Sequence, residues 1–347
     1  MGASSRVRLL QHVEFLEKNK VHVSEFHFFS SDQLQNSYLR GSHSLLSSIT
    51  SYFLRFRQLL AYRGKLMIIE KELFPYLPYF IEKWFLKTPY IVDIDDAVHV
   101  QYTSSNYWLV RILLKRKIEK ILAGSQSVLA GSEFLVNFAT NCNAERVSYI
   151  PSSVPEILGH IISPKIPRAS KALRICWIGS PSTGQYLESI KAFISKASLQ
   201  LNVKFIFIGV SATKFSKLLT GNVEYISWSA DTEYEIISGC DVGIMPLPDG
   251  PFERGKCSYK LIQYMACGLP VLASPVGENL NVLEHGFNGY FCSDTKDWLH
   301  YLSILYEKSD LRVEMGKKSL AKFRENYSSS IASAKLLNEI YYSEGKN

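Results

Sequence analysis

The sequence predicts an α/β protein built from two doubly wound units. Short apolar segments of strand length alternate with segments of helical periodicity along most of the 347 residues, which is the order expected of parallel sheets covered by helices. The proline-punctuated polar stretch 163–171 interrupts this alternation once, as a linker does. Because the chain is long enough for two cores, we expect domains at 1–165 and 166–325. The helical segment 326–347 is expected to cross back to the first domain.

Besides a basic helical pattern at 108–122, the first half contains two segments of helical pattern and four of strand pattern. The helices are expected at Arg6–Lys20 and Tyr52–Ala61, and the strands at Val21–Phe29, Lys65–Ile69, Tyr90–Ile94 and Ser127–Ala130. A doubly wound domain normally opens on a buried strand, whereas here residues 1–5 lead directly into a helix. We therefore expect the first strand of this domain to be missing from the sequence.

The second half repeats the rhythm with stronger signals. The strands are expected at Leu173–Ile178, Val203–Val210, Val223–Ile226, Val242–Met245 and Val271–Ala273. Helices are expected at Gln185–Ala197, at Tyr259–Ala266 and through most of 310–342. The cluster Cys267-Gly268-Leu269-Pro270 ends the middle helix.

Composition excludes several classes of protein. With 46% hydrophobic and 13% aromatic residues the chain can form a core, and no apolar stretch reaches the ~20 residues of a spanning helix. The N-terminus lacks the apolar segment of a signal peptide. Six cysteines without a CxxC pair are typical of reduced thiols in a cytoplasmic protein, and they predict no metal site.

The positive charge is concentrated in the first half, where 1–168 holds 20 Lys and Arg against 14 Asp and Glu. Its densest part is a helical pattern at 108–122, whose apolar residues are interleaved with Arg111, Lys115, Arg116, Lys117 and Lys120. Such a helix is either the solvated outer face of a core helix or a contact with an anionic membrane surface. No nucleic-acid-binding signature accompanies the charge, so we expect no nucleic-acid partner.

The first candidate ligand-binding loop follows the strand at 173–178. Gly179, Ser180 and Thr183 lie between this strand and the expected helix, where backbone N–H groups and hydroxyls suit an anion. The alternative is simple capping of the helix by a hydroxyl.

The second candidate loop follows the strand at 242–245 and is richer in charge. It carries Glu253, Arg254, Gly255 and Lys256, and Lys260 follows in the first turn of the next helix. Ligands of open α/β sheets bind beyond the carboxyl ends of strands, and cations there suit a diphosphate. The alternative is a basic surface loop.

Three carboxylates and a histidine lie at the end of the buried strand at 90–94, and the first of them, Asp93, is within the strand. Asp95 and Asp96 come directly after it, and His99 lies three residues on. Carboxylates at a strand end can bind a sugar hydroxyl, a metal or a proton. The alternatives are turn and helix capping for the aspartates, and packing for His99.

Several of these segments together resemble glycosyltransferase family 4, which has the GT-B fold. The resemblance rests on Gly255-Lys-Cys-Ser-Tyr-Lys-Leu-Ile-Gln-Tyr-Met-Ala-Cys-Gly-Leu-Pro-Val271, on Ser274-Pro-Val-Gly277 and on Gly286-Phe-Asn-Gly-Tyr290. It extends to 177–183, 92–97 and 4–8, and it is similar to a bacterial surface-polysaccharide branch that contains the Asp-Asp pair and Gln-Tyr-Met-Ala. The resemblance implies two Rossmann-like domains facing a central cleft, with the nucleotide-sugar on the C-terminal domain and the acceptor on the N-terminal domain.

The resemblance also implies roles for residues of the candidate loops. Lys256 and Lys260, with Arg254, would bind the diphosphate, and Gly179, Ser180 and Thr183 would line its phosphate side. Gln263 would bind ribose, at a position where the family commonly has a glutamate. The family's first glutamate, eight residues earlier, is replaced by Gly255, and Glu253 is the candidate substitute.

Two further roles complete the expected site. Asp95 and Asp96 would orient the transferred sugar or the acceptor hydroxyl, Asp95 standing where the family often has a histidine. Trp228, after the strand at 223–226, lies where relatives place the nucleobase; it either flanks the base or packs against its own domain.

The expected function is therefore a retaining, metal-independent glycosyltransferase without cofactor. It would move a sugar from a nucleotide-diphosphate donor to a lipid-linked or other glycan acceptor in surface polysaccharide biosynthesis, in the cytoplasm or on the inner face of the membrane. Departures at the glutamate positions leave one alternative, a non-catalytic binding or partner subunit with the same fold.

Overall fold

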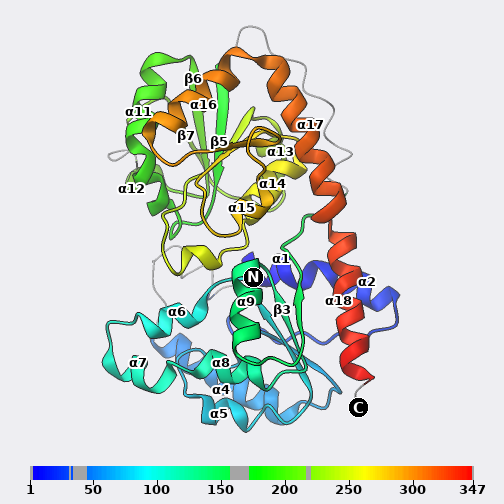
Figure 1. The fold of residues 1–347 in the computed structure, drawn as a ribbon. Coiled ribbons are helices and arrows are strands. Elements are labelled where there is room, and N and C mark those ends of the chain that lie inside the picture. Colours follow the sequence, from blue (N-terminus) through cyan, green and yellow to red (C-terminus); the bar gives the residue numbers. More distant parts are fainter. Residues whose placement is uncertain (1–2, 31–32, 34–44, 157–171, 216–219, 346–347) are drawn as a thin grey trace. The chain divides into compact units, whose positions relative to one another are not determined.

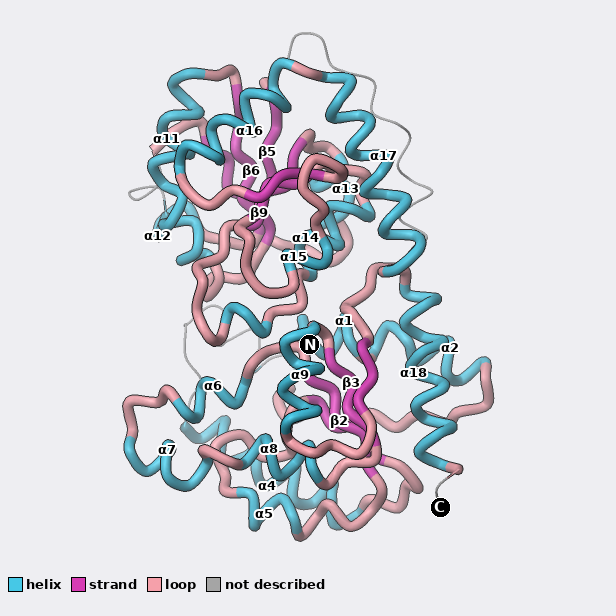
Figure 2. Tube along the Cα trace, viewed as in Figure 1, coloured by secondary structure: helices cyan, strands magenta, loops and turns pink. Residues whose placement is uncertain are grey.

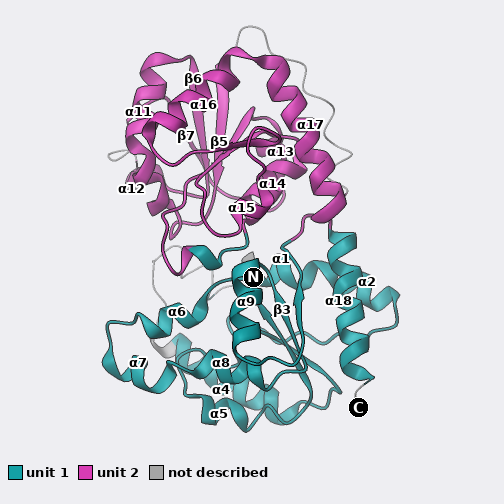
Figure 3. Ribbon diagram, viewed as in Figure 1, with its two compact units in different colours: residues 1–152, 254–257, 329–347 teal, residues 153–253, 258–328 magenta. Residues whose placement is uncertain are grey.

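The computed structural model describes residues 3–30, 33, 45–156, 172–215 and 220–345, so the predicted linker at 163–171 lies outside the described residues. The chain forms two compact units. Unit 1 comprises residues 1–152, 254–257 and 329–347, and unit 2 comprises 153–253 and 258–328 (Figure 3). The short segments 254–257 and 329–347 thus belong to unit 1 although they follow parts of unit 2 in the sequence.

Unit 1 is a four-stranded parallel sheet covered by helices on both faces (Figures 1 and 2). Its strands are β1 (Met67–Glu70), β2 (Tyr90–Ile94), β3 (Ser127–Ala130) and β4 (Val147–Tyr149). Its helices are α1 (Ala3–Arg8), η1 (Leu10–His12), α2 (Val13–Lys18), α4 (Leu45–Ala61), α5 (Tyr79–Lys83), α6 (Val98–Thr103), α7 (Trp108–Leu114), α8 (Lys117–Ala123), α9 (Glu133–Asn141) and α18 (Ser329–Glu344).

The alternation of buried residues along these strands creates two cores. On β2, Tyr90 and Val92 belong to the core shared with residues of α6, α8 and α9, whereas Ile91 faces the core shared with α2 and α18. From α18, Ala332, Leu336 and Ile340 pack there. The C-terminal helix is therefore part of unit 1.

The sheet of unit 1 winds in one direction only, because its order is β1-β2-β3-β4. The strand predicted at Val21–Phe29 is wrong: this segment has no strand ladder, and the described residues before Met67 contain no strand. Val21 and Val23 do pack against the second core. The alternation therefore indicated a face toward the core, but no strand among the described residues pairs with this segment.

Unit 2 contains a six-stranded parallel sheet of order β10-β9-β8-β5-β6-β7. Its strands are β5 (Leu173–Ile178), β6 (Val203–Ile208), β7 (Val223–Ile226), β8 (Val242–Met245), β9 (Val271–Ala273) and β10 (Gly289–Phe291). Its helices are η2 (Gly184–Ile190), α11 (Lys191–Gln200), α12 (Ala212–Phe215), α13 (Glu233–Ser238), η3 (Glu253–Gly255, whose last two residues lie in unit 1), α14 (Tyr259–Ala266), α15 (Asn279–Val282), α16 (Thr295–Glu307) and α17 (Ser309–Asn326).

From β5 the chain adds strands first on one side (β6, β7) and then on the other (β8, β9, β10). The order of winding therefore reverses between β5 and β8, and unit 2 is doubly wound as predicted. The helix predicted at Gln185–Ala197 begins instead as the seven-residue 3₁₀ helix η2 and becomes α-helical only at Lys191. Ligands of doubly wound sheets bind beyond the carboxyl ends of the strands at such a reversal. We therefore expect a ligand-binding site of unit 2 at the loops after β5 and β8.

Candidate functional site

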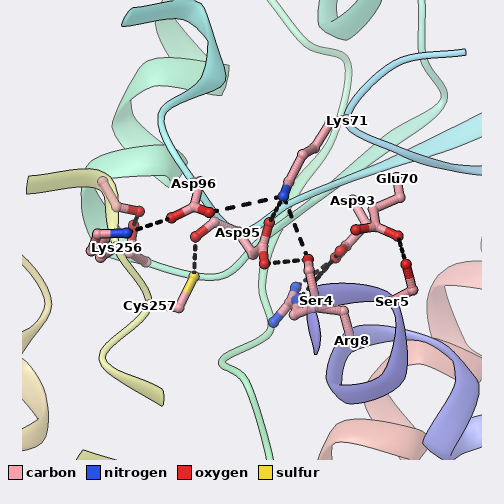
Figure 4. Close-up of polar contacts among 12 residues, drawn as sticks. Ser4, Ser5, Arg8, Glu70, Lys71, Asp93, Asp95, Asp96, Lys256 and Cys257 are labelled. Carbon is pink, nitrogen blue, oxygen red and sulfur yellow. Dashed lines mark hydrogen bonds and ion pairs between the residues drawn. The ribbon is translucent and has the colours of Figure 1, made fainter. Parts of the chain in front are cut away.

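The carboxyl end of the sheet in unit 1 carries a compact group of charged side chains, drawn in Figure 4. Asp95 and Asp96 follow β2, and Lys71 follows the neighbouring strand β1. Lys71 Nζ lies 2.8 Å from Asp95 Oδ1 and 3.9 Å from Asp96 Oδ2. The Ser4 hydroxyl, from α1, also donates to Asp95. Parallel strands thus bring residues that are distant in sequence to one polar edge.

The segment 254–257 brings a second lysine to this group. Lys256 Nζ lies 3.4 Å from Asp96 Oδ1, and the Cys257 thiol donates to the Asp95 backbone carbonyl over 2.8 Å. The approach is so close that a Cβ on Gly255 would lie 2.6 Å from the Cβ of Ala97. Only glycine therefore fits at 255 without a shift of the backbone around Ala97.

The two aspartates differ in acidity. Burial alone raises the pKa of Asp95, but the ion pair with Lys71 and the hydrogen bonds from Lys71 and Ser4 outweigh burial and lower it. Burial and the charge of Asp95 raise the pKa of Asp96 against the opposing Lys256 and Lys71. Neighbouring carboxyl groups whose pKa values are pushed apart are able to divide acid and base roles between them.

A second ion pair lies directly behind this group and is fully buried. Arg8 on α1 contacts Asp93 on β2 through Nη2 at 2.6 Å and Nε at 3.2 Å, and its Nη1 donates to the Ile150 carbonyl at 2.5 Å. Both side chains are at most 2% exposed. Asp93 is therefore a structural residue that ties α1 to the sheet.

His99 stacks on Phe138 with ring centroids 3.7 Å apart, and burial lowers its pKa to about 4. A neutral ring held between helices α6 and α9 fits the packing alternative of the sequence prediction.

In unit 2 the loops after β5, β6 and β7 converge at the carboxyl edge of the sheet. Gly209, after β6, has φ +87°, and a Cβ there would lie 2.1 Å from the Gly179 carbonyl oxygen and 3.4 Å from the Trp228 Cβ. A side chain at Gly209 would therefore push apart the loops that carry Gly179 and Trp228. These two predicted site residues therefore both lie against Gly209.

The hydroxyls of the first candidate loop form a local network. Ser180 Oγ lies 2.8 Å from Ser182 Oγ and 3.4 Å from Thr183 Oγ1, and Thr183 Oγ1 donates to the Ser180 carbonyl. Thr183 precedes η2 but its side chain makes no capping hydrogen bond. The capping alternative is therefore not what the structure shows at this position.

Lys260 lies beside the same loop through its contact with Trp177. Its Nζ is 4.1 Å from the centroid of the Trp177 ring, a cation–π distance. A Cβ on Gly179 would lie 2.5 Å from the far edge of that ring and 2.6 Å from Thr183 Oγ1. Gly179 and Lys260 thus both lie against the ring of Trp177, and Thr183 lies beside Gly179.

Gln263 and Trp228 meet at a carboxylate that the sequence analysis did not identify. The Trp228 indole N–H donates to Glu233 Oε2 over 2.7 Å, and Gln263 Nε2 donates to the same oxygen over 3.4 Å. Glu233 is 1% and Gln263 3% exposed, whereas Trp228 is 46% exposed. The indole therefore has its polar edge fixed while much of its surface faces solvent.

Glu253 is held by the η2 helix, because the Tyr186 hydroxyl donates to Glu253 Oε1 over 2.8 Å. Arg254, the next residue, is exposed. The predicted donor loop is thus divided: Glu253 belongs to unit 2, while Arg254, Gly255 and Lys256 belong to unit 1.

The basic helix predicted at 108–122 is two helices, α7 and α8, with a break at Lys115 and Arg116. Lys117 is not part of a basic surface: its Nζ is buried 2.5 Å from Glu72 and 2.7 Å from Glu82. Arg111 and Lys120 are exposed with the two residues of the break. None of the described helices is both long and apolar enough to span a membrane.

Sequence reasoning missed Lys71, Ser4 and Glu233. Lys71 follows β1 as Asp95 follows β2, so the rule that parallel strands end at one edge could have found it. The family resemblance included Ser4 within 4–8 without giving it a role, and nothing in the pattern singled out Glu233.

Residues 172–308 match the family model described as Glycosyl transferases group 1. No curated protein matches the sequence. Many solved structures are similar to the chain, among them the following three.

Sucrose-phosphate synthase from Thermosynechococcus elongatus has a TM-score of 0.67 and 14% identity, over 86% of this chain and 78% of that chain. Anabaena HepE in complex with UDP-glucose has a TM-score of 0.62 and 14% identity, over 95% of this chain and 88% of that chain. A mutant of S. aureus TarM in complex with UDP, Fondaparinux and alpha-GlcNAc-glycerol has a TM-score of 0.60 and 17% identity, over 83% of this chain and 58% of that chain.

These structures share two parallel sheets covered by helices, which confirms the predicted fold class, while the narrower assignment to family 4 stays a prediction. The chain has the GT-B fold, and its residues 172–308 match the glycosyltransferase group 1 family.

Proposed function

We propose that this protein is a retaining glycosyltransferase that needs no metal. It moves a sugar from a nucleoside-diphosphate sugar to a glycan acceptor, lipid-linked in the main case, in surface polysaccharide biosynthesis. One observation carries the proposal: within the segment that matches the group 1 family, Gly179 and Lys260 both lie against Trp177 of β5, the strand at which the winding of the sheet reverses and near which such sheets bind ligands.

The donor is bound by unit 2 in this proposal. Lys260 supplies positive charge to the diphosphate, and Lys256 is the second predicted phosphate ligand. The loop of Gly179, Ser180 and Thr183 lines the phosphates with hydroxyls and backbone N–H groups. Because the diphosphate gains negative charge as the bond to the sugar breaks, positively charged donors stabilise the transition state more than the substrate.

The remaining predicted residues bind the other parts of the two substrates. Gln263 binds the ribose and Trp228 flanks the base. Glu253 stays close to the phosphate loop through Tyr186. Asp95 and Asp96 orient a sugar or acceptor hydroxyl, and the raised pKa of Asp96 suits the partner that accepts a hydrogen bond or a proton.

The first experiment is a thermal-shift screen with UDP, GDP, ADP and CMP, followed by UDP- and GDP-sugars. UDP is the leading probe because the similar HepE and TarM structures hold UDP or UDP-glucose. Ligand that binds only the folded state raises its stability by mass action, so one diphosphate should shift the melting temperature selectively. The double variant Lys256→Ala/Lys260→Ala should lose that shift, and an undiminished shift would contradict the donor assignment.

A non-catalytic subunit of the same fold is the second candidate. It is favoured by one observation: Lys256, a predicted diphosphate ligand, is engaged by Asp96. A binding subunit would take up UDP without turning over a UDP-sugar. Slow release of UDP from a UDP-sugar in the absence of acceptor identifies the enzyme, and binding without release identifies the subunit.

The proposal includes a membrane surface as a partner. The contact is made by α7 alone and not by the whole segment 108–122 that the sequence analysis considered. α7 attaches to the core through Val110 and Leu114. It exposes Trp108, Leu109, Ile112 and Leu113 by 52–68%, next to the exposed Arg111 and Lys115. Apolar side chains beside cations suit an anionic bilayer surface, which supports the inner face of the cytoplasmic membrane as the proposed location of the reaction.

Sedimentation with vesicles rich in phosphatidylglycerol tests this partner. Trp108→Ser/Ile112→Ser should lower the bound fraction several-fold, whereas Leu199→Ser, at an apolar residue of unit 2 that is 85% exposed, should not. Equal binding by the two variants would contradict membrane contact through α7.

A further inference from the structure

Glu233 lies at the meeting point of two predicted donor-binding residues. It is the first residue of α13, it is 1% exposed, and one of its oxygens accepts from both Trp228 and Gln263. Trp228 comes from the loop after β7 and Gln263 from α14. A single buried carboxylate therefore positions two side chains from different elements.

The bond to Glu233 determines which end of the Gln263 amide is turned away from it. A carboxylate only accepts hydrogen bonds, so the group of Gln263 that faces Glu233 is the NH2. The side chain of Gln263 also hydrogen-bonds the Tyr234 hydroxyl. With its NH2 directed toward α13, Gln263 presents its carbonyl oxygen on the other side, and an acceptor of this kind suits the hydroxyl of a sugar diol.

The same geometry explains why residue 263 is a glutamine in this chain. A glutamate at 263 would bring a second carboxylate to within about the 3.4 Å that now separates Nε2 from Glu233 Oε2. Two buried carboxylates so close repel each other unless one takes up a proton. An amide at 263 and a carboxylate at 233 form a matched donor–acceptor pair.

We propose that Glu233 is a positioning residue of the nucleotide site, and that the pair Glu233–Gln263 recognises the ribose hydroxyls of the donor. Glu233 supplies from α13 the carboxylate that the sequence resemblance places on α14, and it acts through Gln263 and through the indole of Trp228. This inference rests on the proposed function, which assigns the ribose to Gln263 and the base to Trp228, and it adds Glu233 as the residue that positions both.

The proposal predicts that the two side chains can be exchanged. In Glu233→Gln/Gln263→Glu the carboxylate sits on α14 and the amide on α13, so the pair remains complementary. In Gln263→Glu alone two carboxylates face each other, and in Glu233→Gln alone neither side chain imposes an orientation on the other. The double variant should therefore bind better than either single variant.

The test is calorimetric binding of UDP, 2′-deoxy-UDP, 3′-deoxy-UDP and inorganic pyrophosphate. A site that hydrogen-bonds a hydroxyl rejects the analogue that lacks it, so the wild type should prefer UDP to one or both deoxy compounds by about 10-fold or more. Glu233→Gln and Gln263→Glu should reduce that preference to about 3-fold or less while pyrophosphate affinity stays within about 2-fold. The double variant should recover the preference.

Glu235→Gln is the matched control, because Glu235 lies on the same helix and is exposed; it should leave all four affinities unchanged. A merely structural role for Glu233 would weaken pyrophosphate and UDP equally, and that result overturns the inference. An unchanged ribose preference in Glu233→Gln also overturns it while leaving the proposed function intact. If the wild type binds no nucleotide, the proposed donor site falls and the inference falls with it.

Discussion

The carboxyl edges of the two sheets are built from different chemistry. In unit 1 the edge consists of Asp95, Asp96, Lys71 and Lys256, so its charges neutralise one another within the protein. In unit 2 the edge consists of glycines, hydroxyls, an amide and an indole, with Lys260 over Trp177. The comparison teaches that the same strand topology can serve either to hold a fixed set of charges or to line a ligand with neutral donors and acceptors.

This difference separates stability from binding. Substitutions of Arg8, Asp93 or Lys71, which have no part in the proposed substrate contacts, should act mainly on folding, because a buried charge that loses its partner is strongly unfavourable. Substitutions at the edge of unit 2 should act mainly on nucleotide affinity.

The largest effect is expected for Arg8→Met, which leaves Asp93 buried without its partner. We expect a loss of about 3–5 kcal/mol in the free energy of unfolding, measured in urea. Arg8→Met/Asp93→Leu removes both charges and should recover most of this loss. A double variant as unstable as the single one would mean that packing of the Arg8 side chain, and not the ion pair, is what matters.

A pH effect of almost the same size is expected from His12, which is 2% exposed with Nδ1 2.7 Å from Ser333 Oγ. Burial, and then the charge of Arg8, lower its pKa from 6.5 to about 4. Between these values the unfolded chain binds more protons than the folded one, so stability rises with pH. The contribution is complete above pH 6.5 and is lost as the pH falls toward 4, by at most about 3 kcal/mol.

His12→Gln keeps a hydrogen-bonding side chain beside Ser333 and should flatten the stability profile between pH 4 and 6.5. The control is His300→Gln, at an exposed histidine of unit 2. Identical slopes in the wild type and His12→Gln would show that His12 does not carry the acid sensitivity.

Lys260 in unit 2 and Lys71 in unit 1 allow the roles of the two edges to be compared with the same substitution. Lys260→Met should weaken UDP binding by about 10- to 100-fold, because a charge-assisted phosphate contact is lost while the aliphatic stem still covers Trp177. Its unfolding free energy should change by about 1 kcal/mol or less. Lys71→Met should do the reverse, lowering stability and leaving UDP affinity within about 3-fold. The reverse assignment of the two phenotypes would contradict the division of roles.

Much of the fold could be predicted from the sequence because its strands are short, apolar and bounded by turns. Tyr90–Ile94, Leu173–Ile178 and Val242–Met245 are strands with the bounds that were expected. The prediction failed where local pattern and tertiary neighbours disagree. Val21–Phe29 alternates like a strand but has no pairing partner, and the helix expected at 108–122 breaks at Lys115 and Arg116 so that Lys117 can reach Glu72 and Glu82.

The site residues could be predicted only where motif and strand end coincide. Gly179 directly follows β5, and Lys260 and Gln263 lie in α14, the helix after the loop that follows β8; their proposed roles stay predictions. The partners of these residues could not be predicted, because Glu233 meets Gln263 only after α13 and α14 have packed. In the same way, the pairing of Lys256 with Asp96 depends on the return of 254–257 to unit 1, which no periodicity indicates.

The smallest effect expected is for two serines that occupy comparable positions at the two edges. Ser4 donates to the carboxylate of Asp95, whereas Ser180 belongs to the hydroxyl network with Ser182 and Thr183. Ser4→Ala should lower the unfolding free energy by about 1 kcal/mol, since a hydrogen bond to a charged group is lost, with unchanged UDP affinity. Ser180→Ala should leave stability within about 0.5 kcal/mol and weaken UDP binding by about 2- to 10-fold, as expected for one hydrogen bond to a phosphate. Because both variants remove a single hydroxyl, urea unfolding and calorimetry on the pair compare the two edges with side-chain size held constant, and equal phenotypes would mean that the two edges do not differ in role.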